Sequence, residues 1–143
     1  MKHFDILLVE NDEVDALLIK DLFLEKNIHA VLKFAKNDIE ALTILKEGCK
    51  IATAPKILFI DINNEKLNGL HLLNQIRKHP DLKSTLVFVL TASDNEANKK
   101  LALSYNIAAY IRKPLNTEKK SEVFAILHEY LNIIEFSRVN IQL

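Results

Sequence analysis

The chain has 143 residues, the size of one domain at roughly 100–200 residues per domain. Its nineteen Lys and Arg residues balance its nineteen Asp and Glu residues, so a strongly basic nucleic-acid-binding protein and an acidic disordered chain are both disfavoured. Apolar residues make up 49% of the chain and charged residues 27%, which is enough apolar material for a sizeable single core.

The longest uninterrupted apolar runs have five residues, as in Leu86–Leu90, whereas a transmembrane helix needs roughly 20. We therefore expect no membrane-spanning helix. The N-terminus lacks the longer apolar stretch of a secretory signal. Cys49 is the single cysteine and cannot form an intramolecular disulfide, which fits a reducing compartment. A cytoplasmic protein is expected.

Short apolar runs alternate with longer segments in which apolar residues recur near every 3.6 positions. Five runs predict strands at Ile6–Val9, Val31–Ala35, Ile57–Ile60, Leu86–Leu90 and Ala108–Arg112. The run at Ile57–Ile60 has no polar alternation, as expected for a parallel strand that is covered on both faces.

The segments between the runs predict helices, the last of them over Thr117–Ile133. Their predicted inward residues are Val14, Leu17, Leu18 and Leu22, then Ile39, Leu42 and Leu45, then Leu70, Leu73 and Ile76, and finally Val123, Phe124, Leu127 and Leu131. Asn37 with Glu40, and Ser93 with Glu96, have the spacing of capping boxes at helix starts. Pro80 ends the third helix.

Five strands alternating with five helices predict one parallel sheet with helices on both faces. Ligands bind to such sheets at the carboxyl ends of the strands, where the strand order reverses. The residues at these ends are Glu10, Asn11, Asp61, Thr91 and Lys113.

These residues form a chemically coherent set. Glu10 and Asp61 can gather a hard divalent cation, for which Mg²⁺ is the expected choice. Lys113 supplies a point charge for an anionic group, and Thr91 supplies a hydroxyl. A carboxylate beside a cation can attack a phosphoryl group and form an acyl phosphate, which is the role predicted for Asp61.

Five segments carry a family resemblance: Ile6–Asn11, Ile57–Asp61, Asn68–Leu70, Thr91–Ser93 and Tyr110–Pro114. In this order and spacing they resemble the receiver domain of bacterial two-component response regulators, over about residues 4–133. The resemblance implies an α/β fold of the flavodoxin-like type, a doubly wound five-stranded parallel sheet of (βα)5 topology with strand order 2-1-3-4-5.

The resemblance also implies a role for each site residue. Asp61 accepts phosphate from a histidine kinase, Thr91, Ala92 and Lys113 bind the phosphoryl group, and Thr91 and Tyr110 form the switch. The implied Mg²⁺ ligands are Glu10, Asn11, Asp61 and Asn63. Pro114 follows Lys113 in a peptide bond that is commonly cis, and Gly69 occupies a turn where glycine permits a conformation costly for other residues.

The sequence departs from the family pattern at Asn11, where a second acidic residue is usual. Two carboxylates in the pocket are therefore expected rather than three. Asp12 can compensate, but its role as the N-cap of the first helix is the favoured interpretation. Glu65 stands where the loop after the phosphorylated aspartate often carries proline, and we expect it to change loop stiffness more than chemistry.

Residues 1–133 are assigned to the receiver domain and residues 134–143 to a C-terminal extension, with no output domain in the chain and no DNA binding. The expected partner is a sensor histidine kinase or a phosphotransfer protein. Residues 81–83 and the extension are similar to regulators that pair with phytochrome-type kinases. Alternating apolar residues from Val139 to Leu143 suggest an added strand in a homodimer, with chain-end disorder as the alternative.

Two other functions share parts of this pattern. A phosphohydrolase of the haloacid-dehalogenase type needs a second aspartate two positions after the nucleophile, where this chain has Asn63. A pseudo-receiver that binds a partner without phosphorylation is suggested by Asn11. We expect a signalling receiver rather than an enzyme, one that catalyses only its own phosphotransfer and slow dephosphorylation.

Overall fold

A computed structural model describes residues 4–28, 30–51, 54–62, 66–115 and 117–133. Within these ranges the chain forms five strands, β1 (Phe4–Val9), β2 (Ala30–Ala35), β3 (Ile57–Asp61), β4 (Leu86–Thr91) and β5 (Ala109–Arg112). The helices are α1 (Glu13–Glu25), α2 (Asp38–Lys50), α3 (Gly69–Lys78), α4 (Glu96–Leu103) and α5 (Glu118–Ile133). All strand pairs are parallel, in the order β2-β1-β3-β4-β5, which confirms the predicted fold class.

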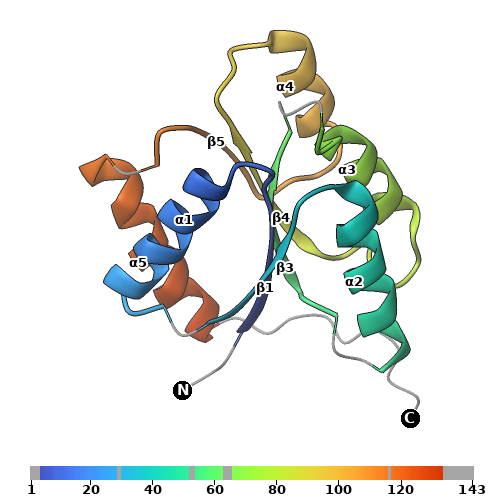
Figure 1. Ribbon diagram of the computed structural model, residues 1–143, viewed down its shortest axis with the longest axis horizontal. Helices are drawn as coiled ribbons and strands as arrows, with labels where there is room; N and C mark the ends of the chain where they lie inside the picture. Colours follow the sequence, from blue (N-terminus) through green and yellow to red (C-terminus); the bar gives the residue numbers. More distant parts are fainter. Residues whose placement is uncertain (1–3, 29, 52–53, 63–65, 116, 134–143) are drawn as a thin grey trace.

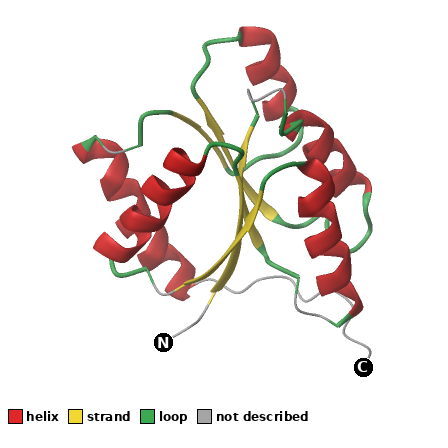
Figure 2. Cartoon of the chain, in the orientation of Figure 1, coloured by secondary structure: helices red, strands yellow, loops and turns green. Residues whose placement is uncertain are grey.

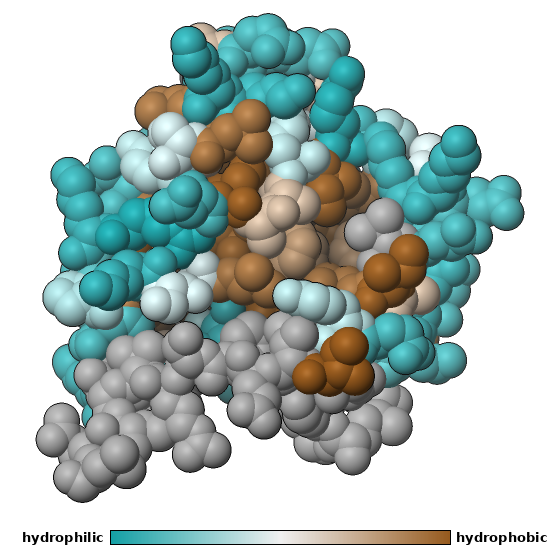
Figure 3. Space-filling view, turned by 180° about the vertical axis from the view of Figure 1, so that it is seen from behind, coloured by the Kyte–Doolittle hydropathy of each residue, from teal (hydrophilic) through white to brown (hydrophobic). Residues whose placement is uncertain are grey.

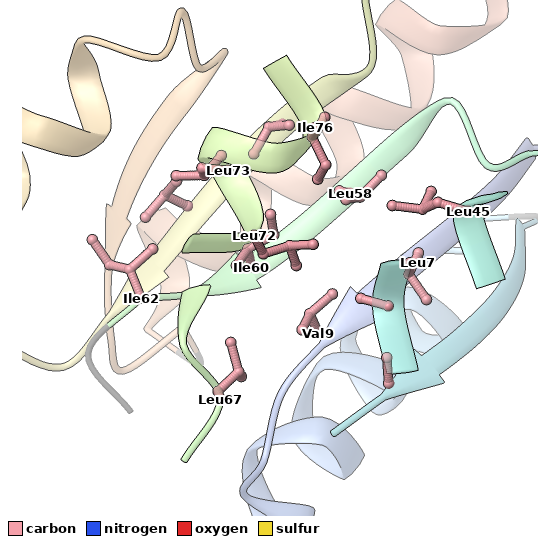
Figure 4. Close-up of a cluster of buried hydrophobic side chains, with 14 of the residues drawn as sticks. Leu7, Val9, Leu45, Leu58, Ile60, Ile62, Leu67, Leu72, Leu73 and Ile76 are labelled. Atoms are coloured by element: carbon pink, nitrogen blue, oxygen red, sulfur yellow. The ribbon is translucent and has the colours of Figure 1, made fainter. Parts of the chain in front are cut away.

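Two layers of helices enclose the sheet. Helices α1 and α5 lie on one face, and α2 and α3 lie on the other (Figures 1 and 2). Alternate residues of each strand point to opposite faces. In β3, Leu58 and Ile60 therefore join the cluster under α2 and α3 that Figure 4 shows, while Ile57 and Phe59 join the cluster under α1 and α5.

Aromatic rings tie α1 and α5 to the sheet. The Phe59 ring of β3 stacks on Phe88 of β4 with their centroids 4.9 Å apart. Phe23 of α1 meets Phe59 edge to face at 5.8 Å, and Phe124 of α5 lies 6.0 Å from Phe59. Pairs of this kind add to the free energy gained from burying the rings. The contacts fix α1, whose first turn borders the predicted site.

The buried face of α1 differs from the predicted one. Leu22 is buried as expected, but Val14 and Leu17 are 76% and 56% exposed, and Ile19 and Phe23 are buried in their place. Apolar residues surround most of this helix, so the spacing alone does not select one face. Ile39, also predicted inward, is exposed as well.

Of the two predicted helix caps, one is confirmed and the other is wrong. The Asn37 side chain accepts a hydrogen bond from the Glu40 backbone N–H at 2.9 Å, so Asn37 caps α2 as predicted. The prediction that Ser93 caps α4 is wrong. Asn95 is the cap, and its side-chain oxygen accepts from the Asn98 N–H at 3.0 Å, because the β4–α4 loop is longer than predicted.

Arg77 stabilises the end of the sheet that lies opposite the predicted site. Arg77 of α3 donates hydrogen bonds to the backbone carbonyls of Lys83, Thr85, Tyr105 and Asn106 over 2.6–3.1 Å. These carbonyls belong to the segments that lead into β4 and β5. The guanidinium therefore satisfies backbone groups that the loops leave unpaired.

Gly69 is required for a different reason from the predicted one. The left-handed conformation falls on Asn68, whose φ is 58°, and no glycine has positive φ among the described residues. A Cβ atom on Gly69 would instead lie 2.5 Å from the Asp61 carbonyl oxygen and 3.0 Å from the Ile62 Cα. Gly69 thus lets α3 begin against the backbone of the predicted phosphoacceptor.

Replacing Gly69 by alanine is expected to lower the free energy of unfolding by about 1–3 kcal/mol, because the added methyl group must displace backbone atoms. Urea denaturation of Gly69→Ala and of the natural chain measures the difference. Asn68→Gly is the matched control, because it relaxes the left-handed residue without adding an atom, and it should change stability by less than about 1 kcal/mol. A larger loss in Asn68→Gly than in Gly69→Ala would contradict this account.

Candidate functional site

The parallel register brings the carboxyl ends of the central strands together. Ile60 pairs with Val9, Asp61 with Leu90 and Thr91 with Arg112, so the residues that follow β1, β4 and β5 lie at the same edge as Asp61. Of the residues predicted to form the site, Glu10, Asp61 and Lys113 are in direct contact.

The ammonium group of Lys113 is the centre of this site. Its Nζ lies 2.7 Å from Glu10 Oε2, 2.7 Å from Asp15 Oδ2 and 3.0 Å from Asp61 Oδ2. The side chains of Glu10, Asp61 and Lys113 are 0%, 9% and 11% exposed, whereas that of Asp15 is 35% exposed. Since an ammonium has three N–H donors, each can point to one of these carboxylates.

Asp15 is the site residue that sequence reasoning missed. The expectation of two carboxylates is wrong, because Asp15 supplies a third one beside Lys113. An acidic residue in the first turn of a helix is ordinarily explained by the helix dipole, which hides any second role. The signal that was present is its position: helix α1 starts two residues before Asp15, directly after the strand end that carries Glu10.

Asp12 has the predicted structural role. Its Oδ1 accepts hydrogen bonds from the Val14 N–H at 2.8 Å and the Asp15 N–H at 3.1 Å, which confirms it as the N-cap of α1. Its own N–H donates to Glu10 Oε1 at 3.1 Å. Asp12 therefore holds Glu10 from one side and the Asp15 backbone from the other.

Burial and charge together set the protonation of the site. Burial raises the pKa of Glu10 to about 7, and the nearby charge of Asp61 adds to this, against the hydrogen bond that Lys113 donates. Burial alone would lower the pKa of Lys113, but its hydrogen bonds to Asp15 and Glu10 and the charge of Asp61 raise it above its ordinary value. Lys113 therefore stays a cation over the physiological range.

Thr91 is fully buried, and its hydroxyl is engaged with the following loop. Its Oγ1 accepts from the Ser93 N–H at 3.0 Å, and the hydroxyl donates to the Ser93 carbonyl at 3.4 Å. The Lys113 N–H donates to the Thr91 carbonyl at 2.7 Å, which joins β4 to the residue after β5. Ala92, the next residue, is exposed and lines a hollow of about 280 Å³ together with Asp15 and Lys113.

Tyr110 and Pro114 flank Lys113. Tyr110 is half-buried in β5, and Lys99 Nζ lies 5.7 Å from the centroid of its ring, within the range of a cation–π contact. The Lys113–Pro114 peptide bond is cis, as expected from the resemblance. Arg112 pairs with Asp94 of the β4–α4 loop at 2.5 Å.

The predicted magnesium ligands that the structure describes differ in where their side chains point. The Asn11 side-chain amide lies 3.5 Å from the Lys36 carbonyl and so faces the β2–α2 loop. Asn63 and Glu65 lie outside the described residues. Among the residues that are described, no three His, Cys, Asp or Glu side chains are grouped so that they could hold a metal ion. Glu10 and Asp61 do fit a hard cation, because two buried carboxylates meet at one positive charge.

Comparisons with known proteins agree on one family. The family model of the response regulator receiver domain matches residues 6–125. The response regulator Rcp1 of Synechocystis sp. is 28% identical over 113 residues, 78% of this chain and 77% of that protein. The probable methanogenesis regulatory protein FilR2 of Methanothrix harundinacea is 29% identical over 129 residues, 89% of this chain and 83% of that protein.

Solved structures agree with this result. The phosphorylated cyanobacterial phytochrome response regulator RcpA has a TM-score of 0.80 at 25% identity and covers 94% of this chain and 99% of its own. The Mn²⁺-bound form of Rcp1 has a TM-score of 0.76 at 24% identity, with coverage of 94% and 99%, which supports the fold.

The raised pKa of Glu10 predicts a pH-dependent stability in the metal-free protein. Folding favours the protonated Glu10 carboxyl, so Glu10 adds its full contribution to the free energy of unfolding below its ordinary pKa of 4.5. That contribution is lost as the pH rises through about 7. Relative to Glu10→Gln, the natural chain should lose about 2–3 kcal/mol of unfolding free energy over that window. Urea denaturation in a chelator, from pH 4.5 to 8, measures the loss.

Glu122→Gln is the control, because it removes one exposed carboxylate of α5 away from Lys113. Parallel stability curves for the natural chain and Glu10→Gln over the whole pH range would contradict the assignment of a raised pKa to Glu10.

Proposed function

Because the chain belongs to the family of response regulator receiver domains, we propose that it is a phosphorylation-dependent switch whose phosphoacceptor is Asp61. The observation that carries the proposal is the contact of Asp61 with Lys113 at the end of a fully buried strand. A carboxylate oxygen of Asp61 attacks the phosphorus of a phosphohistidine and forms a P–O bond. The P–N bond breaks, and its electron pair stays on the imidazole nitrogen, which takes up a proton from solvent. The product is an acyl phosphate.

The other site residues act on the transferred group. Lys113 pairs with the phosphoryl oxygens, and the Thr91 hydroxyl and the Ala92 backbone N–H donate hydrogen bonds to them. The Thr91 hydroxyl must first leave Ser93, which it contacts in the structure. This movement provides a link from the phosphoryl group to the β4–α4 loop. Tyr110 is then the second switch residue, and Gly69 and Pro114 keep the backbone around Asp61 and Lys113 in place.

Mg²⁺ is typical of the family, and we assign Glu10, Asn11, Asp61 and Asn63 as the residues that would hold it here. When bound, the cation neutralises negative charge on the phosphoryl oxygens. The charge of the site supports this assignment. Three ionised carboxylates and one ammonium leave a net charge of −2, which one divalent cation balances.

Membership of the family makes the chain a signalling protein rather than a classical enzyme. We also propose that the chain slowly hydrolyses its own acyl phosphate. The pseudo-receiver alternative came from the charge lost at Asn11. Asp15 restores a third carboxylate to the surroundings of Lys113, and this observation favours a working phosphorylation site over a pseudo-receiver.

A sensor histidine kinase or a phosphotransfer protein is the proposed donor, because receiver domains accept phosphate from histidine kinases. A phytochrome-type kinase is the more specific proposal, and the similarity to RcpA, a phytochrome response regulator, supports it. No helix in the described part of the chain is long and apolar enough to cross a membrane. A cytoplasmic location belongs to the same proposal. So does the absence of nucleic-acid binding, which the zero net charge supports.

We also propose that residues 1–133 form the receiver domain and that residues 134–143 form an extension. The extension, including the alternation from 139 to 143 that suggested a homodimer, lies outside the described residues. Figure 3 shows a hydrophobic area in the middle of one face of the molecule, bordered by hydrophilic side chains. A surface of this kind supports an interaction with a protein partner, and a homodimer remains our proposal.

Replacing Asp61 by asparagine should abolish phosphorylation, because the amide keeps the shape of the side chain and removes the nucleophile. The protein is incubated with acetyl phosphate and Mg²⁺, and intact mass spectrometry measures the phosphorylated fraction. Asp21→Asn, which changes an exposed aspartate of α1, is the control and should be labelled like the natural chain. Undiminished labelling of Asp61→Asn would refute the assignment, and a natural chain that is never labelled would favour the pseudo-receiver.

Asn11→Asp is expected to tighten Mg²⁺ binding about tenfold, or roughly 1–2 kcal/mol, because it adds a negative charge near the ion at the expense of desolvation and repulsion from Glu10 and Asp61. The Lys36 carbonyl, which faces Asn11, would repel the new carboxylate toward the site. Calorimetric titration at pH 7 and fixed ionic strength measures both affinities. Asn27→Asp controls for net charge at the far end of α1, and equal affinities of Asn11→Asp and the natural chain would contradict the expectation.

A further inference from the structure

The three carboxylates around Lys113 are not equivalent. Glu10 follows β1 and is completely buried, and Asp61 ends β3 and is nearly so. Asp15 lies in the first turn of α1, and its side chain is 35% exposed. Its distance to Lys113 Nζ, 2.7 Å, is nevertheless as short as that of Glu10.

The ammonium has no spare hydrogen-bond donor for a phosphoryl group. Its three N–H groups are matched by Glu10, Asp15 and Asp61 at 2.7–3.0 Å. The N–H that points to Asp61 can pass to a phosphoryl oxygen on that residue, but a second hydrogen bond from Lys113 to the phosphoryl group must displace Glu10 or Asp15.

The cost of release decides which carboxylate leaves. Freeing Glu10 would leave a completely buried carboxyl group without its ammonium partner, which is expensive. Freeing Asp15 returns a half-exposed carboxylate to solvent at the N-terminal end of a helix, where the helix dipole favours negative charge. Releasing Asp15 from Lys113 therefore costs less free energy than releasing Glu10.

We propose that Asp15 is a positioning residue that holds the Lys113 ammonium in the unphosphorylated protein and yields it to the phosphoryl group on Asp61. This inference rests on the proposed function. Asp15 acts through Lys113 and competes with the phosphoryl group for the same ammonium. The more strongly Asp15 binds Lys113, the more slowly Asp61 is phosphorylated.

The test compares phosphorylation rates of Asp15 variants of the full chain with acetyl phosphate and Mg²⁺. Asp15→Asn keeps the size of the side chain and weakens its hold on Lys113, so the second-order rate constant should rise about three- to tenfold. Asp15→Ser is a second variant without the charge, and its rate constant should rise as well. Asp15→Glu restores a carboxylate and should return the rate toward that of the natural chain, which a packing role of Asp15 would not predict.

Glu13→Gln is the matched control, because it removes a charge from the same helical turn and has no contact with Lys113 among those described. An equal acceleration in Glu13→Gln and Asp15→Asn would overturn the proposal, since it would reflect reduced repulsion of the anionic donor. A slower or unchanged rate in both Asp15→Asn and Asp15→Ser would also overturn it. A natural chain that is not phosphorylated at all would refute the proposed function, and this inference with it.

Discussion

A lysine ammonium buried among carboxylates is the constraint on which the site depends. Lys113 follows β5 and Glu10 follows β1, and β3 and β4 lie between these strands in the sheet. The long side chain of Lys113 crosses that edge, so its charge links segments about one hundred residues apart in the chain. Neither Glu10 nor Lys113 could be buried alone as an ion, because an unpaired charge in a protein interior costs several kcal/mol.

The rest of the fold holds these charged groups at short distances. Gly69 lets α3 approach the Asp61 backbone, and Asp12 fixes both Glu10 and the start of α1. The rings around Phe59 anchor α1 on the sheet from the other side. Burial still favours the neutral form of Glu10, so the site keeps its negative charge at some expense of stability. A site of this kind gains most from binding a cation.

The sequence predicts the strands and the strand-end residues well, because strands buried on both faces must be apolar and polar residues must follow them. It predicts helix faces and loop geometry less well. Val14 and Leu17 were assigned inward on a helix that is apolar on most sides, and Ser93 was assigned a cap that belongs to Asn95. Asp15 was missed because only the packing of α1 on the sheet decides that its side chain faces Lys113.

In this chain the third carboxylate near Lys113 comes from position 15, and position 11 carries an amide. A carboxylate at position 11 would lie at the half-exposed strand end, where the Asn11 amide now donates to the Lys36 carbonyl. Asp15 carries the same charge on the first turn of a helix, where water reaches it and where it contacts Lys113 instead. The chain therefore keeps three carboxylates around Lys113, and among these three Asp15 alone has a substantially exposed side chain. That difference makes the ammonium available to an arriving phosphoryl group without uncovering a buried charge.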